Sequence, residues 1–260
     1  MSIATITRTA YTSPTSQATF LSMLDTAMGV AGFTLYDSKN ITTVENRIYS
    51  LTVSASAKGI VYLRMFLTTA MSITSRLSSA WNTSTNTASD EGGSTTATGF
   101  SLTSLETINF IAINSAELKG VLITQGTASF LLGVIRPANI ENWYDESQFN
   151  MAINADNTNN AAMRGTTLIP GGSGNAWGTN LHSLLSNVNP FAGNTRQIKP
   201  IEFLNPSGYG TVAHTSSDLV YCAPNGITGT GIAELVTSTA TYLYLGKNSS
   251  LSSALAVRIA

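Results

Sequence analysis

The feature that most constrains the fold is a set of short segments in which apolar and polar residues alternate. In RIYSLTVSA, which begins at Arg47, the residues Tyr49, Leu51 and Val53 fall on one face and hydroxyl residues fall on the other. A period of two places such a segment in a β-strand with one buried face. We predict that a turn at Ala57–Gly59 joins it to the apolar strand GIVYLRMFLTTAMSIT, so that the two form a hairpin.

Further strands are expected wherever turn residues bound an apolar run. They are Phe33–Tyr36, Thr107–Asn114, Glu117–Thr124 and Ala128–Ile135, followed by strands in GTVAHTSSDLVYC, GIAELVT, ATYLYLG and ALAVRI. Short linkers that carry Asn, Ser or Gly favour antiparallel connections between them. The stretch from Ala138 to Pro206 has little periodicity and is expected to form long loops.

One amphipathic helix is predicted near the N-terminus. Ser13 suits the N-cap and Pro14 the first helical position, where a missing N–H costs nothing. The apolar residues that follow recur at helical spacing: Phe20, Leu21, Leu24 and Met28. Gly29 and Gly32 supply the stop.

A second, short helix is expected in SITSRLSSAWN, where Ile73, Leu77 and Trp81 recur at intervals of four. Taken together, the elements predict a mainly β chain: an antiparallel, β-sandwich-like body with one N-terminal amphipathic helix and long ordered loops. Residues 1–137 would hold the helix and an antiparallel sheet. Residues 138–260 would form a loop-rich segment that returns to the sheet, either as a second part or within one continuous β domain.

Composition adds a second constraint, a shortage of charge. Charged residues make up 10% of the chain, where about 25% is usual, and hydrophobic residues make up 43%. The formal net charge is -1, so no basic field attracts phosphates, and we expect no nucleic-acid partner. Little electrostatic repulsion keeps copies of such a chain apart. We therefore expect a protein that associates with other subunits.

The tract Ala80–Ser104 shows this shortage clearly. It is full of Ser, Thr, Asn and Gly and holds one acidic pair, Asp90 and Glu91, with no basic residue. A solvated linker normally carries charge, whereas a contact surface avoids it because desolvating a charge is costly. We predict that this tract is a contact arm or interface loop. Met1–Ser13 and Ala138–Gly178 are expected to provide further contacts.

No arrangement of residues in the sequence supports catalysis or a cofactor. His182 and His214 have no Cys or His at metal-ligand spacing, and no G-x-S-x-G elbow is present. PGGSGNAWG lacks the lysine of a phosphate-binding loop. NADNTNN spaces oxygen-bearing side chains two apart but lacks the glycine and final glutamate of a calcium loop, so calcium is only a minor alternative. Cys222, the single cysteine, is expected to be a small buried residue on a strand.

Aromatic residues and one arginine are the candidate contact residues. Trp143, Tyr144 and Trp177 suit a protein interface, where Trp, Tyr and Arg are enriched. They also suit a platform on which sugar rings stack. Arg136 precedes this group and fits the interface better, and Trp81 is counted with it as a candidate interface residue.

No segment is expected to enter a membrane or a secretion pathway. No window approaches the roughly 18 apolar residues needed to span a bilayer. The start, MSIATITRTAYTSPTSQ, lacks the basic segment and apolar run of a secretory signal. The chain is therefore expected to be made in a cytoplasm.

Four segments carry a resemblance to a known class of proteins. They are FLSMLDTAMGVAGFTLY, RIYSLTVSASAKGIVYLRM, GVIRPANIENWYDE and LAVRI. On these segments, which extend loosely over most of the chain, the sequence resembles tailed-bacteriophage virion proteins of the tail, baseplate or fibre-attachment class. The resemblance carries over no functional residue.

The resemblance implies a non-enzymatic, multi-copy part of a virion that is assembled in the host bacterial cytoplasm and released by lysis. Its partners would be other virion proteins and further copies of itself, arranged as a ring or trimer. Within this class the alternative is a capsid decoration, or cement, protein. Outside it, the alternative is a carbohydrate-binding or receptor-binding module.

Overall fold

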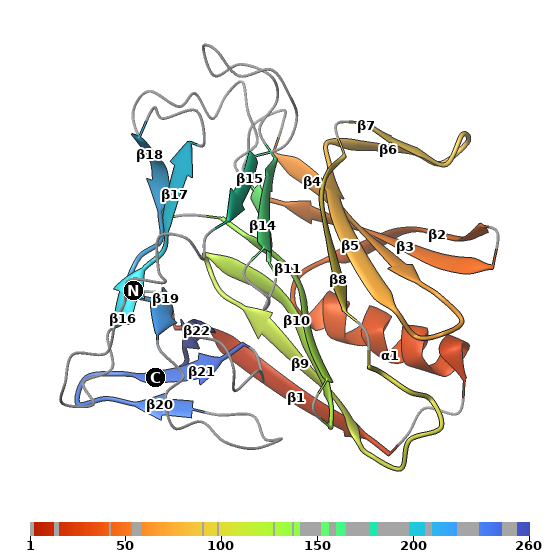
Figure 1. The fold of residues 1–260 in the computed structure, drawn as a ribbon, viewed down its shortest axis with the longest axis horizontal. Helices are drawn as coiled ribbons and strands as arrows, with labels where there is room; N and C mark the ends of the chain where they lie inside the picture. Colours follow the sequence, from red (N-terminus) through yellow and green to blue (C-terminus); the bar gives the residue numbers. More distant parts are fainter. Residues whose placement is uncertain are drawn as a thin grey trace.

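The computed structural model describes residues 3–12, 16–41, 43–53, 59–89, 91–97, 99–126, 128–136, 138–140, 152–155, 160–164, 177–180, 198–205, 210–222, 234–245 and 254–260. Within these ranges the chain is mainly β, with antiparallel strands and one α-helix, α1 (Gln17–Val30). Figure 1 shows α1 beside β9 and beneath the sheet that carries β3, β4 and β5. The predicted fold class, an antiparallel, sandwich-like β body with an N-terminal helix, is confirmed.

The largest sheet has seven strands in the order β1-β9-β10-β11-β13-β14-β15. Their bounds are β1 (Thr5–Tyr11), β9 (Ile108–Asn114), β10 (Leu118–Gln125), β11 (Ala128–Ile135), β13 (Ala152–Ala155), β14 (Asn160–Arg164) and β15 (Trp177–Asn180). The strands predicted for β9, β10 and β11 are confirmed. Because β1 pairs with β9 along its whole length, the prediction that Met1–Ser13 reaches outward is wrong for this strand, while its predicted contact with other subunits stays a prediction.

The second large sheet, called here the N-terminal sheet, has the order β2-β3-β4-β5-β8. Its strands are β2 (Thr34–Ile41), β3 (Val44–Thr52), β4 (Ile60–Leu67), β5 (Ile73–Ser78) and β8 (Gly92–Ala97). The predicted hairpin is the β3–β4 pair. The predicted strand Phe33–Tyr36 continues farther, because β2 pairs with β3 up to Ile41.

Two predictions for the segment after β4 are wrong. The expected helix around Ile73 is instead β5, followed by β6 (Ala80–Asn82). Ile73, Ser75 and Leu77 are all buried. Because Ser75 is polar, the apolar residues on this face, Ile73 and Leu77, are four positions apart in the sequence, which is also the spacing of residues on one face of a helix. The tract Ala80–Ser104 is not a single arm or loop, because it forms the β6–β7 hairpin, with β7 at Thr87–Ser89, and the strand β8. Its predicted role as a contact surface stays a prediction.

The last third of the described chain forms two smaller antiparallel sheets. One has the order β16-β19-β22-β21-β20, with β16 (Ile198–Pro200), β19 (Leu219–Cys222), β22 (Ala254–Arg258), β21 (Thr241–Tyr244) and β20 (Glu234–Val236). The other joins β12 (Asn139–Ile140), β18 (Gly210–His214) and β17 (Glu202–Asn205). The C-terminal strands are as predicted. The expectation of loops alone between Ala138 and Pro206 is wrong, because β12 to β17 lie in this range. Strands of two to five residues are too short to show an alternating pattern in the sequence.

Helix α1 begins three residues later than the sequence suggested. Ser16, not Ser13, is the N-cap, and its Oγ accepts a hydrogen bond of 3.1 Å from the Thr19 N–H. The side chain of Gln17 holds this end in place by donating to the Thr68 carbonyl at 2.6 Å. Thr68 is far from Gln17 in the sequence, so this contact cannot be predicted from local capping preferences. Those preferences alone do not distinguish Ser13 from Ser16 as the N-cap.

The end of the helix forms a Schellman motif. Gly32 has a φ of +95°, and its N–H donates to the Gly29 carbonyl at 3.0 Å. The N–H of Phe33 donates to the Met28 carbonyl, also at 3.0 Å, which completes the two hydrogen bonds of this motif. The role predicted for Gly32 is confirmed, while Gly29 lies within the helix.

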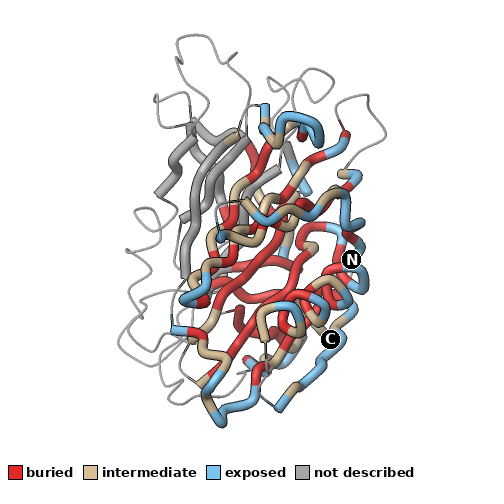
Figure 2. Tube along the Cα trace, turned by 90° about the vertical axis from the view of Figure 1, so that its right-hand side faces the viewer, coloured by how far each residue is buried: buried red, intermediate tan, exposed pale blue. Residues whose placement is uncertain are grey.

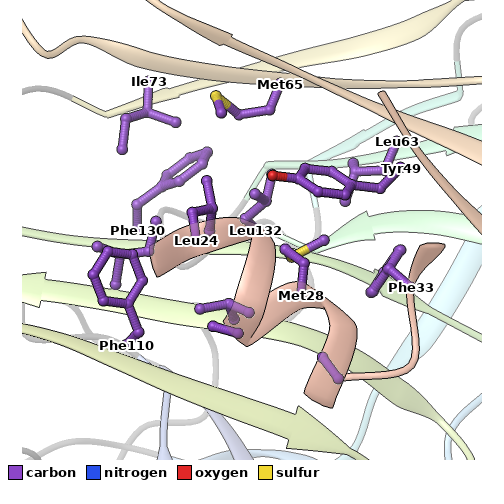
Figure 3. Close-up of a cluster of buried hydrophobic side chains, with 14 of the residues drawn as sticks. Leu24, Met28, Phe33, Tyr49, Leu63, Met65, Ile73, Phe110, Phe130 and Leu132 are labelled. Atoms are coloured by element: carbon purple, nitrogen blue, oxygen red, sulfur yellow. The ribbon is translucent and has the colours of Figure 1, made fainter. Parts of the chain in front are cut away.

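A single hydrophobic core joins α1 to both large sheets (Figure 3). The helix contributes its buried face: Phe20, Leu21, Leu24, Ala27 and Met28. The N-terminal sheet contributes residues that include Tyr49, Leu63, Met65 and Ile73, and the seven-stranded sheet contributes residues that include Phe110, Phe130 and Leu132. Each fully buried side chain of this size stabilises the fold by roughly 1.5–3 kcal/mol.

The strands β9, β10 and β11 are buried on both faces. Residues that point away from the α1 core are also buried: Ile111, Ile113, Leu118, Leu122, Leu131 and Ile135. Figure 2 shows buried residues running without interruption along strands in the middle of the molecule. Burial on both faces accounts for the continuous apolar runs of these strands, because a strand with one solvated face would alternate.

A buried carboxylate connects the start of β10 with the C-terminal part of the chain. Oε1 of Glu117 accepts hydrogen bonds from the N–H groups of Ala138, at 2.9 Å, and Ser216, at 2.8 Å. Its Oε2 accepts a further bond of 2.5 Å from the Ser216 hydroxyl. Hydrogen bonds to an ionised acceptor are the stronger kind, so this side chain fixes the turn before β19 against the seven-stranded sheet.

A second polar contact closes the core between α1 and β3. The buried Tyr49 hydroxyl donates to Asp25 Oδ1 at 2.7 Å, and Arg47 Nε lies 3.4 Å from Asp25 Oδ2. Burial raises the pKa of Tyr49 well above its ordinary value, the negative charge of Asp25 and the hydrogen bond to it act in the same direction, and Arg47 opposes them. The phenol therefore stays protonated in the folded chain.

This arrangement predicts a loss of stability at high pH. Above about 10, the ordinary pKa of tyrosine, the unfolded chain loses the Tyr49 proton while the folded chain keeps it, so the free energy of unfolding falls as pH rises. We expect Tyr49→Phe to reduce this alkaline fall and, at neutral pH, to cost about 1–3 kcal/mol through the lost bond to a charged acceptor. Urea unfolding across pH would measure both. An unchanged alkaline slope would contradict the assignment.

The facing glycines of β10 and β11 give a second prediction. Gly120 pairs with Gly133, and a Cβ on Gly120 would lie 2.7 Å from the Leu132 carbonyl oxygen. We expect Gly120→Ala to lower the free energy of unfolding by about 1–3 kcal/mol because the strands must move apart. The matched control is Gly29→Ala in α1, where an added Cβ meets nothing within 4 Å. It should raise stability by about 0.5–1 kcal/mol, and a thermal or urea melt that ranks the two variants oppositely would refute this packing.

Candidate interaction surface

The candidate site lies on the face of the N-terminal sheet that points away from the core. Along β4, Val61, Leu63, Met65 and Leu67 are buried in the core, while Ile60, Tyr62, Arg64 and Phe66 alternate with them. The four alternating residues therefore point to the opposite face. An isoleucine, two aromatic residues and an arginine in one row are unusual for a face that would otherwise only meet solvent.

The register of the sheet places a second arginine beside the first. Arg76 of β5 lies directly opposite Arg64 of β4, and Ile48 of β3 lies on the other side of Arg64. Asp37 of β2 is in turn the partner of Ile48. Like charges on directly opposed residues destabilise a sheet, so the two arginines require a nearby negative group.

Glu91 supplies that negative group. Its Oε1 lies 3.1 Å from Arg64 Nη1, and its Oε2 lies 2.9 Å from Arg76 Nη1. The side chains of Glu91 and Arg64 are only 20% and 15% exposed, whereas that of Arg76 is 42% exposed. The bridge to Arg64 is therefore the better shielded half and contributes more to stability, because exposed ion pairs contribute little.

Arg64 is held on every side. Its guanidinium carbon lies 4.1 Å from the centre of the Phe66 ring and 4.8 Å from that of the Trp81 ring. Its Nε and Nη2 both donate to Asn46 Oδ1, at 3.2 and 3.1 Å. Cation–π contacts of this kind contribute about 0.5–2 kcal/mol, more as they lose solvent.

Trp81 fixes the β6–β7 hairpin to this face. Figure 1 shows that hairpin continuing from β5, whose last residue, Ser78, pairs with Tyr62 near the start of β4. The indole Nε1 donates to Asp37 Oδ2 at 2.7 Å, and the residue is buried. The hairpin therefore covers the part of the sheet around Asp37 and Arg64.

Another part of the same face is open. Tyr36 is 45% exposed and its ring lies 5.0 Å from that of Tyr62, at an interplanar angle of 73°. Ile60, two residues before Tyr62 on β4, is also 45% exposed. We call Tyr36, Tyr62 and Ile60 the tyrosine patch.

The surroundings of Tyr62 keep its phenol neutral. Partial burial raises the pKa of Tyr62, and the interaction with Tyr36, including a hydrogen bond between the two side chains, raises it further. Tyr62 therefore presents an uncharged hydroxyl beside the ring surface of the patch at physiological pH.

The structure places the predicted contact residues in different parts of the chain. Trp81 has its ring covered by its own chain. Arg136 is half-buried directly after β11, and its N–H donates to the Glu117 carbonyl at 2.8 Å. Trp177 begins β15, where it pairs with Met163. Trp143 and Tyr144 lie outside the described residues.

The remaining candidates are similarly divided. His214 ends β18 and Cys222 ends β19, while His182 and most of NADNTNN and PGGSGNAWG lie outside the described ranges. No cluster of three or more His, Cys, Asp or Glu residues that could hold a metal ion occurs among the residues that the structure describes. Within that same part of the chain, no helix is long and apolar enough to cross a bilayer.

The sequence reasoning missed Arg64, Asp37 and the tyrosine patch. A signal was present in VYLRMFL, because Tyr62, Arg64 and Phe66 alternate with apolar residues and so must share a face. The apolar strand predicted for GIVYLRMFLTTAMSIT assigns no role to these three residues. The pairing of Arg64 with Arg76 could not be found in this way, because it depends on the register between β4 and β5.

Comparison with known proteins adds no relative. The chain matches no protein-family model, and no curated protein matches it significantly.

Removal of the Glu91 charge should expose the repulsion between the two arginines. We expect Glu91→Gln to lower the free energy of unfolding by about 1–3 kcal/mol, with a smaller loss at high salt because salt screens the repulsion. Arg76→Gln added to Glu91→Gln should restore part of the loss, since one of the facing cations is then gone. Urea titrations at low and high salt measure this cycle. Equal losses at both salt concentrations, or no rescue, would contradict the bridging role.

Proposed function

We propose that the chain is a non-enzymatic structural component of a bacteriophage virion, associated with the tail, baseplate or fibre attachment, that acts by assembly with neighbouring subunits. The observation that carries the proposal is the way in which the chain neutralises its few charges internally. The sequence resemblance to tailed-phage virion proteins supplies the biological setting. A role as a capsid decoration protein is the alternative within the same class.

Most charged side chains in the described part of the chain have an ion-pair partner in the same chain. The pairs are Arg8–Glu234, Lys39–Asp37, Arg47–Asp25, Arg47–Glu45, Arg64–Glu91, Arg76–Glu91 and Arg258–Asp218. A neighbouring subunit that covers such a surface desolvates few unpaired charges, and desolvation of charge is the main cost of burying a polar surface. This chemistry supports packing against other subunits better than recognition of a charged substrate.

The β2 edge of the N-terminal sheet is poorly suited to strand addition, in which a strand of another subunit extends the sheet. In β2, a register shift leaves Tyr36 as an extra residue between Leu35 and Asp37. The next N–H, that of Ser38, donates to Asp37 Oδ1 at 2.8 Å. Bulges and occupied edge groups hinder the addition of another strand, so we infer that subunits do not join by strand addition at this edge.

Size measurement tests the assembly part of the proposal. We expect purified protein to sediment as a homo-oligomer whose mass changes little between low and high salt, because its contacts hold few intermolecular ion pairs. Light scattering coupled to gel filtration over a range of concentrations would measure it. A monomer at every concentration would overturn the proposal. Immunogold labelling of the encoding virus would then test the location, and many copies over the head surface would favour the decoration role.

A further inference from the structure

We propose that the tyrosine patch is a binding site for neutral carbohydrate, of a size that accepts one or two sugar rings. The inference goes beyond the assembly role and does not depend on it. It rests on the arrangement of Tyr36, Tyr62 and Ile60 on the open part of the N-terminal sheet.

The two tyrosine rings form a corner. Their planes meet at 73° with ring centres 5.0 Å apart, so the edge of one ring meets the face of the other. Tyr36 keeps 45% of its surface exposed. An exposed aromatic ring offers a flat apolar surface for the C–H groups of a sugar, and its hydroxyl offers a hydrogen-bonding group at the rim.

Among the described residues, those that lie across the strands from this corner bear hydroxyls and no charge. Ser50 lies opposite Tyr62, Thr34 lies opposite Ser50, and Thr52 lies opposite Ile60. Thr34 and Thr52 are exposed and Ser50 is partly exposed. A hydroxyl both donates and accepts hydrogen bonds, which suits a ligand whose own polar groups are hydroxyls.

The nearest charged side chains are already engaged. Arg64 follows two residues after Tyr62 but is stacked between two rings and paired with Glu91. Asp37 follows Tyr36 and accepts from Trp81. Lys39, on the same face of β2, is paired with Asp37 at 3.6 Å. Among the described residues a phosphate or carboxylate ligand would therefore meet only cations that already have a carboxylate partner, and the site favours a neutral sugar.

The size of the patch argues against a protein as its occupant. A stable protein interface covers about 800 Å² on each partner around an apolar centre. Here the apolar surface comes from three side chains, and Tyr36 and Ile60 each keep less than half of their area exposed. The covering β6–β7 hairpin, fixed by Trp81, limits the open area on the Asp37 side.

The position of the corner is set before a ligand arrives. Tyr62 lies within β4, which pairs on both sides with β3 and β5, and Tyr36 is placed by the bulge of β2. A preformed site loses little conformational entropy on binding. This supports measurable binding by so small a surface.

The test uses the full chain on an array of neutral hexose oligosaccharides, followed by saturation-transfer NMR with the strongest binder. We expect Tyr62→Ala and Tyr36→Ala each to weaken binding at least about tenfold, which corresponds to the loss of about 1.4 kcal/mol. Tyr62→Phe should retain part of the affinity because the ring remains. Leu105→Ala, at a residue that is 95% exposed elsewhere on the chain, is the matched control and should bind normally.

Circular dichroism and thermal melts of each variant would show that it is folded. No binding on the array, or binding that neither tyrosine variant weakens, would overturn the proposal. A change of oligomeric mass in Tyr36→Ala or Tyr62→Ala without any glycan binding would also overturn it, and would assign the patch to a protein contact. The glycan array does not measure assembly. A negative result on the array would therefore overturn the carbohydrate site without bearing on the structural role, which the size measurement tests separately.

Discussion

The structure depends on the burial of the central strands β9, β10 and β11 on both of their faces. One face packs on α1 and the N-terminal sheet in a single core that includes Leu24 and Phe110, and the other carries residues such as Ile111 and Leu122 that are also buried. Hydrophobic burial is the main favourable term in folding. In these three strands the side chains on both faces contribute to it. The smaller elements then need few ionic contacts of their own, which is compatible with a charge content as low as 10%.

The outer face of the N-terminal sheet shows how such a chain uses the charges that it has. Arg64 and Arg76 are forced into direct opposition by the register of β4 and β5. The repulsion is relieved by Glu91, and the aromatic rings of Phe66 and Trp81 enclose the Arg64 guanidinium. The same contacts hold the β6–β7 hairpin in place. One face of the sheet is thereby divided into a covered, charged part and an open, uncharged part.

The sequence predicts elements where burial follows a simple period, and it misses those where a polar residue is buried. The β3–β4 hairpin is predictable because Tyr49 and Leu51 alternate with polar residues. The strand β5 is not, because Ser75 occupies a core position. The start of α1 is missed for a different reason, since the Gln17 side chain contacts the Thr68 carbonyl from a distant part of the chain. The same limit applies to the candidate surface. The residues of one strand that share a face can be predicted from the sequence, but the contacts between neighbouring strands depend on their register.

Glu117 couples two parts of the chain that are separate in sequence. Its carboxylate accepts hydrogen bonds from the main chain of Ala138 and from both the main chain and side chain of Ser216. Any separation of the turn at Ser216 from the start of β10 would break the two hydrogen bonds that Ser216 donates to this carboxylate. Because Ser216 lies three residues before β19, we expect a displacement of that strand to reach the start of β10 through this carboxylate.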